Sequence, residues 1–273
     1  MVDAQTGREL GRSGAKVQAF FRSVTDWHRW LGASGPNRAA ARAVTGASNL
    51  LFLFLVVSGL YLWLPRKWTW PSVRAVLWFR GGLQGKARDF NWHNTSGFWC
   101  CVPLFFVVLS GVVISYPWAC DLVYRASGVA PPARGKSKGG PPARQQGRST
   151  VRLDALVAKV QKLVPEWRTI SLQVPNSDAA PVTFNIDEGN GGQPQKRSTL
   201  TLDRGNGEVL RATGFADQNA GQRARSWMRF VHTGEYYGVV GQTVAGIASA
   251  GGALLGWTGF ALAYRRFRAW RAR

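Results

Sequence analysis

The sequence predicts an integral membrane protein, mainly α-helical, with three transmembrane helices and a small α+β domain outside the membrane between the second and third. Three windows contain no Asp, Glu, Lys or Arg: residues 43–65, 90–120 and 236–264. Each exceeds the roughly 20 residues needed to cross a hydrocarbon core. The segment between the last two windows mixes a helical pattern with strand-like runs. Together these observations exclude an ordinary soluble enzyme, a collagen-like fibre and a disulfide-stapled secreted domain.

The net charge of +21, from 35 Lys and Arg against 14 Asp and Glu, first suggests a nucleic-acid partner. The basic residues, however, are concentrated beside the spans. Residues 65–92 contain six basic residues and one acidic residue, Asp89, and residues 265–273 contain five arginines and no acidic residue. Short basic loops beside spans stay in the cytoplasm, where they also meet anionic lipid headgroups. We therefore expect membrane lipid as a partner, no nucleic acid, a cytoplasmic C-terminus, and an external segment over residues 118–237.

Residues 1–44 form an N-terminal arm, in which residues 17–31 carry apolar and aromatic side chains at helical spacing. This pattern predicts an interfacial helix, closed by Gly35-Pro36. The topology places the arm outside, although it holds seven bases and three acids. Residues 1–31 show no signal-peptide pattern. Two alternatives remain open: the arm inserts N-terminus first, or the chain lacks a preceding span, which we favour.

The remaining membrane segments follow from the same patterns. The first span covers residues 45–64, the basic cytoplasmic loop 65–96, the second span 97–118, the third span 238–264 and the basic cytoplasmic tail 265–273. Many of the 13 tryptophans lie near span ends, as in interfacial aromatic belts.

Each span carries a hydroxyl residue followed by glycine. The three pairs are Ser58-Gly59, Ser110-Gly111 and Thr258-Gly259. Small residues let helices approach closely in lipid, which is the simpler explanation. Close approach to a planar cofactor is the alternative.

The external segment begins with a Pro/Gly-rich linker over residues 119–149 and continues as a small domain over residues 150–215. Residues 153–164 place their apolar side chains on one helical face. Strand-like runs follow at residues 167–174, 181–186 and 197–202, and the turn at residues 203–207 leads into a further strand, a hairpin signal. We expect a helix packed on a three- or four-stranded antiparallel sheet.

All three histidines lie beside spans: His28 before the first, His93 at the mouth of the second and His232 before the third. The topology puts His28 and His232 outside and His93 inside. Histidines at a membrane are costly to desolvate and mark functional sites. They can ligate haem iron, carry protons or satisfy a backbone carbonyl. Because all three share this placement, metal or haem binding is the favoured hypothesis.

Other chemistries find little support in the sequence. Cys100 and Cys101 are adjacent, point to different helix faces and form no CxxC pair, so zinc is disfavoured and we expect buried apolar roles for both. Cys120 is a minor candidate for an external thiol. No P-loop, HExxH or Ser/His/Asp constellation is present, so hydrolases and nucleotide-dependent enzymes have no residues to support them.

At these motifs the sequence resembles the PepSY-associated transmembrane family, which includes bacterial inner-membrane ferric-siderophore reductases. The similarity runs from about residue 25 to 266. The matching segments are W-H-R-W-L-G, S-G-L-Y-L-W-L-P-R-K, W-H-N-T-S-G-F-W, L-S-G-V-V-I-S, L-D-R-G-N-G-E-V-L, F-V-H-T-G-E-Y-Y-G and W-T-G-F. The nine-residue stretch L-D-R-G-N-G-E-V-L looks like the hairpin of a PepSY domain. The resemblance implies that this domain lies in the periplasm.

The resemblance implies a haem b electron carrier in the bacterial inner membrane. Carried over, His28 and His232 are the axial ligands of an external haem iron, and His93 is half of an internal pair. Reductases of the family usually have a preceding span that begins at an internal histidine, and we expect this chain to lack it. The chain would then be an N-terminally shortened member, or one that works with a transmembrane partner supplying the missing ligand. The two external sites differ in spacing, since His28 lies 31 residues before Gly59 and His232 lies 27 before Gly259.

The implied function is electron transfer from a cytoplasmic flavoprotein or a quinol to a ferric siderophore or other Fe(III) chelate in the periplasm. Three arginines, Arg223, Arg225 and Arg229, could attract an anionic chelate, although a solvated or lipid-headgroup role is favoured. The main alternative is a non-enzymatic, membrane-anchored PepSY protein that binds or restrains a partner such as a peptidase. A subunit of a larger redox complex is a third. The histidines discriminate, because a tethered inhibitor does not need them.

Overall fold

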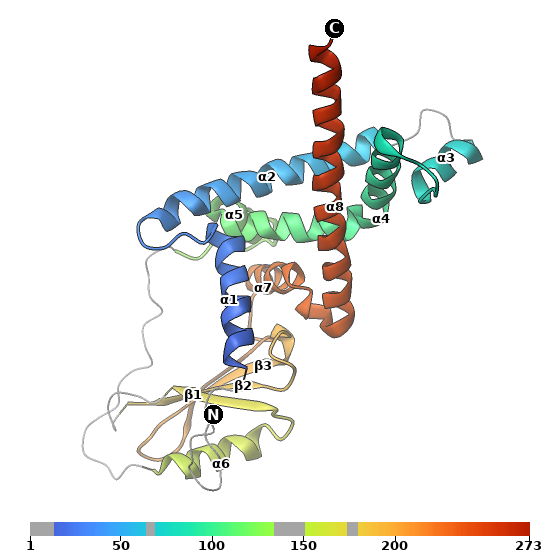
Figure 1. The fold of residues 1–273 in the computed structure, drawn as a ribbon. Coiled ribbons are helices and arrows are strands. Elements are labelled where there is room, and N and C mark those ends of the chain that lie inside the picture. Colours follow the sequence, from blue (N-terminus) through green and yellow to red (C-terminus); the bar gives the residue numbers. More distant parts are fainter. Residues whose placement is uncertain (1–13, 64–68, 134–150, 174–179) are drawn as a thin grey trace. The chain divides into compact units, whose positions relative to one another are not determined.

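The protein is described by a computed structural model that covers residues 14–63, 69–133, 151–173 and 180–273 (Figure 1). Most of the expected Pro/Gly-rich linker, residues 134–149, lies outside the described residues. The chain divides into two units, residues 1–55 and 56–273, and each is described by itself.

The first unit contains α1 (Ala15–Trp30) and the first two thirds of α2 (Asn37–Trp63). The turn after α1 is made by Leu31 and Gly32, whose φ angles of 53° and 75° are both positive. Glycine adopts this conformation at no cost, whereas leucine pays for it. A helix is therefore present where the interfacial helix was expected, and it ends at Trp30, one residue early and five residues before Gly35.

Two contacts hold this helical hairpin together. The indole of Trp30 lies between the guanidinium groups of Arg29 and Arg38, at 4.4 and 4.2 Å from the ring centre. The hydroxyl of Thr45 lies 3.1 Å from the carbonyl oxygen of Arg29 and donates toward it. The sequence W-H-R-W-L-G is thus a helix end whose aromatic residue is stacked between two cations.

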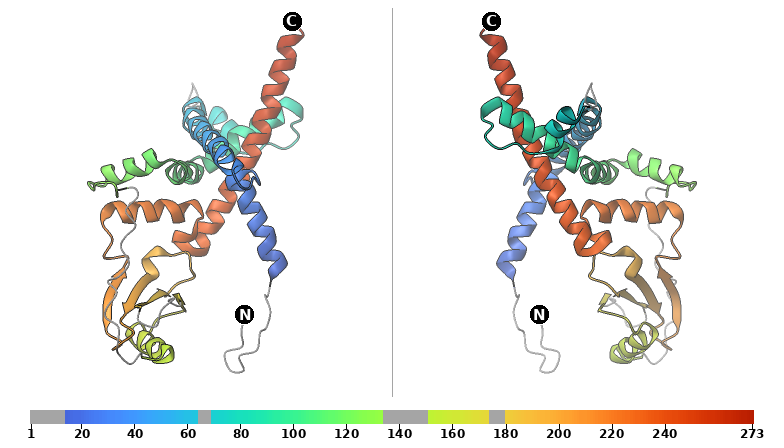
Figure 2. Two further views of the ribbon diagram at one scale, coloured as in Figure 1. Left: turned by 90° about the vertical axis from the view of Figure 1, so that its left-hand side faces the viewer. Right: turned by 90° about the vertical axis from the view of Figure 1, so that its right-hand side faces the viewer.

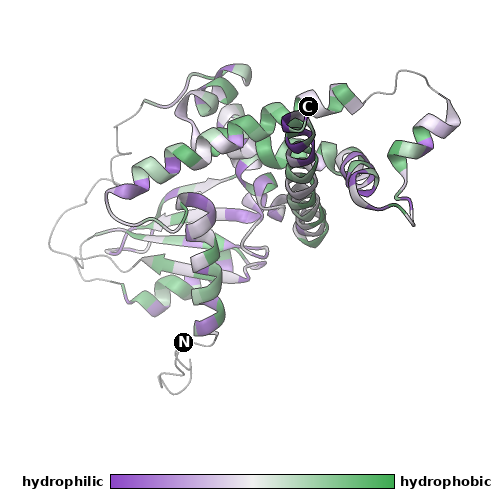
Figure 3. Ribbon diagram, turned by 45° about the horizontal axis from the view of Figure 1, so that its top comes forward, coloured by the Kyte–Doolittle hydropathy of each residue, from purple (hydrophilic) through white to green (hydrophobic). Residues whose placement is uncertain are grey.

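Among the described residues, three helices are long and apolar enough to cross a membrane, as expected: Asn37–Trp63, Gly85–Ser115 and Glu235–Arg271. Figure 3 shows hydrophobic residues along α2 and strongly hydrophilic residues at the C-terminal end of α8 (Gly238–Arg271). In α4 (Gly85–Ser115), 39% of the most apolar window is buried inside the protein, against 6% for each of the other two helices. The second span is therefore the one around which the described helices pack.

Helices α4 and α8 pack antiparallel. The contacts run in opposite order along the two helices and pair Asp89 with Arg265, His93 with Thr258, Gly97 with Leu255, and Cys100 with Gly251. The N-terminal end of α4 and the C-terminal end of α8 consequently lie at the same membrane face. This agrees with three membrane crossings, which also put these two basic ends together.

The second span begins 12 residues earlier than expected, because Asn91 joins the first turns of α4 to α3 (Trp70–Leu77). The side-chain amide of Asn91 donates to the carbonyl oxygens of Ala75 (3.1 Å) and Trp78 (3.0 Å), and its oxygen accepts from the backbone N–H of Arg80 (2.9 Å). Asn91 therefore satisfies backbone groups at the end of α3 that would otherwise lack partners. Most of the loop expected at residues 65–96 is helical.

The small domain has the expected architecture, a helix on an antiparallel sheet (Figure 1). The elements are α6 (Leu153–Leu163), β1 (Thr169–Gln173), β2 (Val182–Asp187), β3 (Arg197–Leu202) and β4 (Val209–Gly214). The strands pair in the order in which they follow one another. One sheet face packs on α6 in a core of Leu156, Val160, Val182, Phe184, Ile186, Leu200 and Leu202. Alternation of apolar and polar residues along β2 produces this one-sided burial.

Besides α3, two further helices were not expected from the sequence: α5 (Pro117–Ala126), at the start of the expected linker, and α7 (Ala220–His232). A reciprocal capping box begins α7, since the side chains of Asn219 and Gln222 each accept from the other residue's backbone N–H. Gly221 lets α7 lie directly on the ring of Tyr124 in α5. Figure 2 shows α7 between the sheet and helices α4 and α5, so α7 connects the sheet domain to the spans.

Candidate functional site

His93 lies inside α4, with its ring against α8. Its Nδ1 is 2.9 Å from the hydroxyl oxygen of Thr258, and that hydroxyl donates its single hydrogen to the carbonyl oxygen of Leu254 at 2.7 Å. The hydroxyl oxygen therefore offers His93 a lone pair, so Nδ1 carries the imidazole proton. In a neutral ring the basic lone pair is then on Nε2, the arrangement in which histidine binds metal through Nε2.

His232 is the last residue of α7, and its ring contacts α4. Its Nδ1 lies 2.8 Å from the carbonyl oxygen of Val107 and 3.2 Å from the hydroxyl oxygen of Ser110. A carbonyl oxygen only accepts hydrogen bonds, so Nδ1 of His232 carries the proton. The same tautomer as in His93 follows, again with the basic lone pair on Nε2.

The two histidines contact different levels of α4. His93 precedes Val107 by 14 residues, which is about 21 Å along a helix that rises 1.5 Å per residue. Axial ligands of one haem iron bind to opposite faces of a single porphyrin and lie much closer than that. His93 and His232 therefore cannot ligate one iron together and belong to two separate sites.

The hydroxyl-glycine pairs of the second and third spans contact these imidazoles. Thr258 accepts from His93, and a side chain at Gly259 would reach within 3.6 Å of Cε1 of that ring. Ser110 contacts His232, and Gly111 beside it is buried. Gly59 in the first span faces open space instead.

A tight turn follows His232 and aligns α7 with α8. Gly234 has a φ of 73°, and it lies so close to the backbone of Gly241 that a side chain at either position would overlap the other. Glu235–Tyr237 form the short helix η2, and Gly238, with φ of 64°, begins α8. The motif H-T-G-E-Y-Y-G therefore forms a chain turn that requires its glycines and determines the position of His232 relative to α8.

His28 belongs to the first unit, so its predicted pairing with His232 stays a prediction. Within α1 it lies in the middle of an exposed apolar face. The apolar side chains of this face are Val17, Phe20, Phe21, Val24, Trp27 and Leu31. An imidazole centred in such a face is placed to meet an apolar partner rather than water.

Other glycines and cysteines serve helix packing. A side chain at Gly251 would overlap Sγ of Cys100, so at this position the small residue permits the close approach of α4 and α8, the simpler of the two explanations. Gly246 and Gly256 have nothing within 4 Å. Cys100 is buried, and Cys101 and Cys120 are partly exposed.

Near His93, one turn toward the N-terminus of α4, lies a buried carboxylate. Asp89 is 2% exposed and pairs with Arg88 at 2.9 Å and Arg265 at 3.0 Å. Two further polar side chains here, Thr95 and Ser96, are buried, and their hydroxyls find no hydrogen-bond partner among the described residues. No cluster of three His, Cys, Asp or Glu that could hold a bare metal ion occurs within the described ranges.

The sequence predicted His93 and His232 as site residues but not the groups that orient their rings. The acceptor of His232 is the backbone carbonyl of Val107, and because every residue has a backbone carbonyl, no residue type marks it in the sequence. The three arginines of α7, Arg223, Arg225 and Arg229, are exposed.

The model of one protein family, described as the PepSY-associated TM region, matches residues 1–266. The chain belongs to the PepSY-associated transmembrane family. This PepSY-associated protein is a membrane protein, with three candidate membrane-spanning helices among its described residues. No curated protein matches the sequence.

Proposed function

We propose that this PepSY-associated protein binds haem b in the inner membrane and passes electrons across it to a periplasmic Fe(III) chelate. One observation carries the proposal: His93 and His232 both use Nδ1 as a donor to an oxygen of a neighbouring helix, at two separate levels of α4. Fixing the second ring nitrogen in this way is how proteins orient a metal-binding imidazole and raise its basicity.

The residues present fit such a group at both levels. His93 would hold one haem at the Asp89 end of α4, and His232 would hold one at the end that meets α7. His28, on the apolar face of α1, is the predicted partner of His232. A further transmembrane partner would supply the second ligand beside His93. Bound haem would provide a one-electron Fe(III)/Fe(II) couple, whose potential follows from axial ligation and burial.

The chain's own residues would set the conditions for transfer. Thr258 and Val107 hold the two rings in one tautomer, and the apolar helices keep water away from them, which lowers the local dielectric. Electrons would come from a cytoplasmic flavoprotein or a quinol. Reduction of the chelate would release iron, because hard oxygen ligands hold Fe(III) far more tightly than Fe(II).

The proposed orientation rests on charge. The N-terminal end of α4 and the C-terminal end of α8 carry many bases, and the one acid at these ends, Asp89, is buried and paired. Such ends stay in the cytoplasm, which puts the sheet and α7 in the periplasm. Alkaline phosphatase fused after Arg273 should be inactive and a fusion within the sheet domain active. The reverse pattern would refute this orientation.

The function is tested by one spectrum of the full chain in lipid nanodiscs, purified from cells supplied with haem. We expect a Soret band that shifts on reduction with dithionite. His93→Ala and His232→Ala should each lower the haem bound per polypeptide, and the double variant should remove it. Asn94→Ala is the matched control, because Asn94 neighbours His93 and its amide donates to the carbonyl of Phe90.

Each outcome decides between the candidate functions. A colourless wild type refutes the haem proposal and favours the non-enzymatic protein that restrains a partner. A coloured protein should also reduce a ferric trihydroxamate when an electron donor is added. Colour without reduction until a second subunit is supplied would indicate a component of a larger redox complex.

A further inference from the structure

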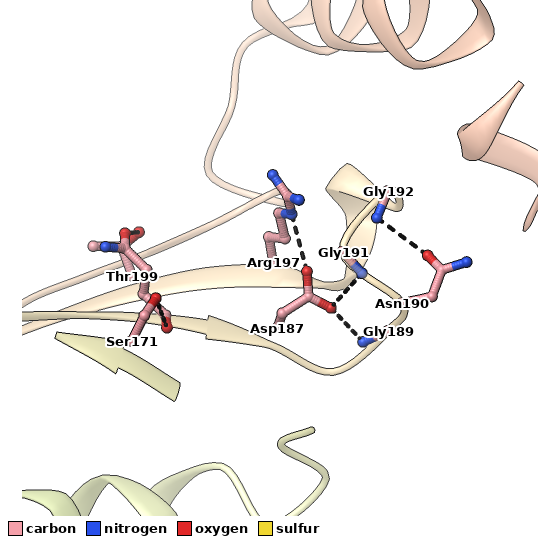
Figure 4. Close-up of polar contacts among 9 residues, drawn as sticks. Ser171, Asp187, Gly189, Asn190, Gly191, Gly192, Arg197 and Thr199 are labelled. Atoms are coloured by element: carbon pink, nitrogen blue, oxygen red, sulfur yellow. Dashed lines mark hydrogen bonds and ion pairs between the residues drawn. The ribbon is translucent and has the colours of Figure 1, made fainter. Parts of the chain in front are cut away.

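The loop between β2 and β3, residues 188–196, is folded around Asp187 (Figure 4). One carboxylate oxygen of Asp187 accepts from the backbone N–H groups of Gly189 (2.7 Å) and Gly191 (3.3 Å), and the other accepts from Nε of Arg197 (3.0 Å). The conformation of the loop is therefore fixed by hydrogen bonds to the side chain of Asp187.

The β2–β3 loop and Arg197, the first residue of β3, contact the chain on both sides of His232. Before it, the guanidinium of Arg197 lies 5.4 Å from the ring centre of Phe230. After it, Gly192 packs directly on Glu235: the first carbon of a side chain at position 192 would lie only 2.5 Å from Cβ of Glu235. The two contacts bracket His232 at two residues before and three residues after.

The opposite side of the same turn is held by α4, through the 2.8 Å contact between His232 and the carbonyl of Val107. N–H···O hydrogen bonds have donor–acceptor distances of about 2.7–3.2 Å. A displacement of the turn by more than about half an ångström would therefore take this contact out of hydrogen-bond range. The position of the turn depends on the loop that presses against it.

We propose that the β2–β3 loop positions His232 through Gly192 and Arg197, so that the PepSY sheet controls the orientation of the imidazole at the end of α4. Gly192 lets the loop approach the turn, and Arg197 links Asp187 to Phe230. The consequence for haem rests on the proposed function, whereas the positioning of the ring does not.

Two alanine variants of the same loop test the proposal. A side chain at Gly192 would overlap the rigid Cβ of Glu235 at 2.5 Å. One at Gly189 would meet Oε1 of Gln193 and Cδ of Lys196, which can move aside, and would lie 3.3 Å from Cβ of Lys196, which requires only a small shift. Neither glycine has a positive φ, so neither substitution strains the backbone. Gly192→Ala should displace the His232 turn, and Gly189→Ala is its matched control.

The first measurement uses haem-free full chain in nanodiscs with ¹⁵N-labelled imidazoles, because three histidines give three distinguishable sets of signals. Gly192→Ala should shift the His232 signals away from those of an Nδ1–H tautomer and leave those of His93 unchanged. Amide hydrogen exchange across η2 should become about tenfold faster. Arg197→Gln should act in the same direction, and Gly189→Ala should change neither readout.

Three results would overturn the proposal: unchanged His232 signals in Gly192→Ala, equal shifts in Gly189→Ala, or parallel shifts of His93 that indicate general unfolding. The haem-loaded protein gives a separate readout. There Gly192→Ala should alter the low-spin electron paramagnetic resonance signal of the His232 site alone. A wild type that binds no haem would refute the proposed function and leave the nitrogen measurement to decide the positioning.

Discussion

The close contact between Gly251 and Cys100 predicts a large difference between glycines of one helix. Replacing Gly251 by alanine puts a methyl group onto Sγ of Cys100 and 3.2 Å from its Cβ, in the middle of the antiparallel packing of α4 and α8. Gly246 and Gly256 face open space, so alanine there meets nothing. The same substitution should therefore have opposite effects along α8.

The magnitudes follow from two terms. Alanine improves helix propensity over glycine by roughly 1 kcal/mol at each position. Overpacking a tight interface costs about 1–3 kcal/mol and applies at Gly251 alone. Gly251→Ala should therefore have a free energy of unfolding about 1–3 kcal/mol lower than Gly246→Ala. Adding Cys100→Ala removes the overlapping sulfur and should restore most of this difference.

The assay is unfolding of the full chain by SDS titration in mixed micelles, followed by far-UV circular dichroism. A double-mutant cycle between positions 100 and 251 should give a favourable coupling energy, because the two side chains share one space. If Gly251→Ala unfolds like Gly246→Ala, or if Cys100→Ala fails to rescue it, the packing of α4 on α8 is wrong and so is the placement of His93 against Thr258.

Three further predictions concern polar side chains. Asp89→Asn should lower the SDS midpoint more than Arg265→Gln does, because the carboxylate is the buried member and keeps Arg88 when Arg265 is lost; equal midpoints would argue against this. Asn91→Ala should cost about 1–3 kcal/mol by leaving backbone groups of α3 without partners, with faster amide exchange over α3 alone; protection there unaltered would contradict it. The pKa of Asp154 is lowered by the N–H of Ala155 and by Arg152, so its carboxylate stabilises the folded state slightly at neutral pH, and this stabilisation is lost as pH falls through the lowered pKa. Asp154→Asn should therefore reduce the acid dependence of amide exchange in α6. An unchanged dependence on pH would contradict this.

The membrane spans and the small domain could be predicted because their signals are local. A charge-free window longer than the bilayer defines a span, and alternation along β2 defines a half-buried strand. The turn at residues 203–207 could be predicted too, because Asp, Asn and Gly favour tight turns. In the structure the N–H of Gly205 donates to the side chain of Asp203 and the N–H of Gly207 donates to its carbonyl oxygen.

What sequence did not reveal depends on contacts between distant segments. Asn91 reads as one polar residue in a loop until α3 brings three backbone groups to it. Helix α7 was overlooked because it is amphipathic and rich in arginine, although the capping pair Asn219 and Gln222 could have marked its start. The histidines were recognisable, whereas their acceptors were not, because a carbonyl of α4 has no residue type.

His93 and His232 donate to different kinds of acceptor, a side-chain hydroxyl and a backbone carbonyl, so substitutions at the accepting residue affect the two imidazoles differently. The proton of His93 is received by the hydroxyl of Thr258, so Thr258→Val would remove this acceptor and leave the backbone of Leu255 as the remaining hydrogen-bond partner. The proton of His232 is received by a main-chain oxygen, which survives every amino-acid replacement at position 107. Among relatives of this chain we therefore expect the residue type to vary more freely at position 107 than at position 258.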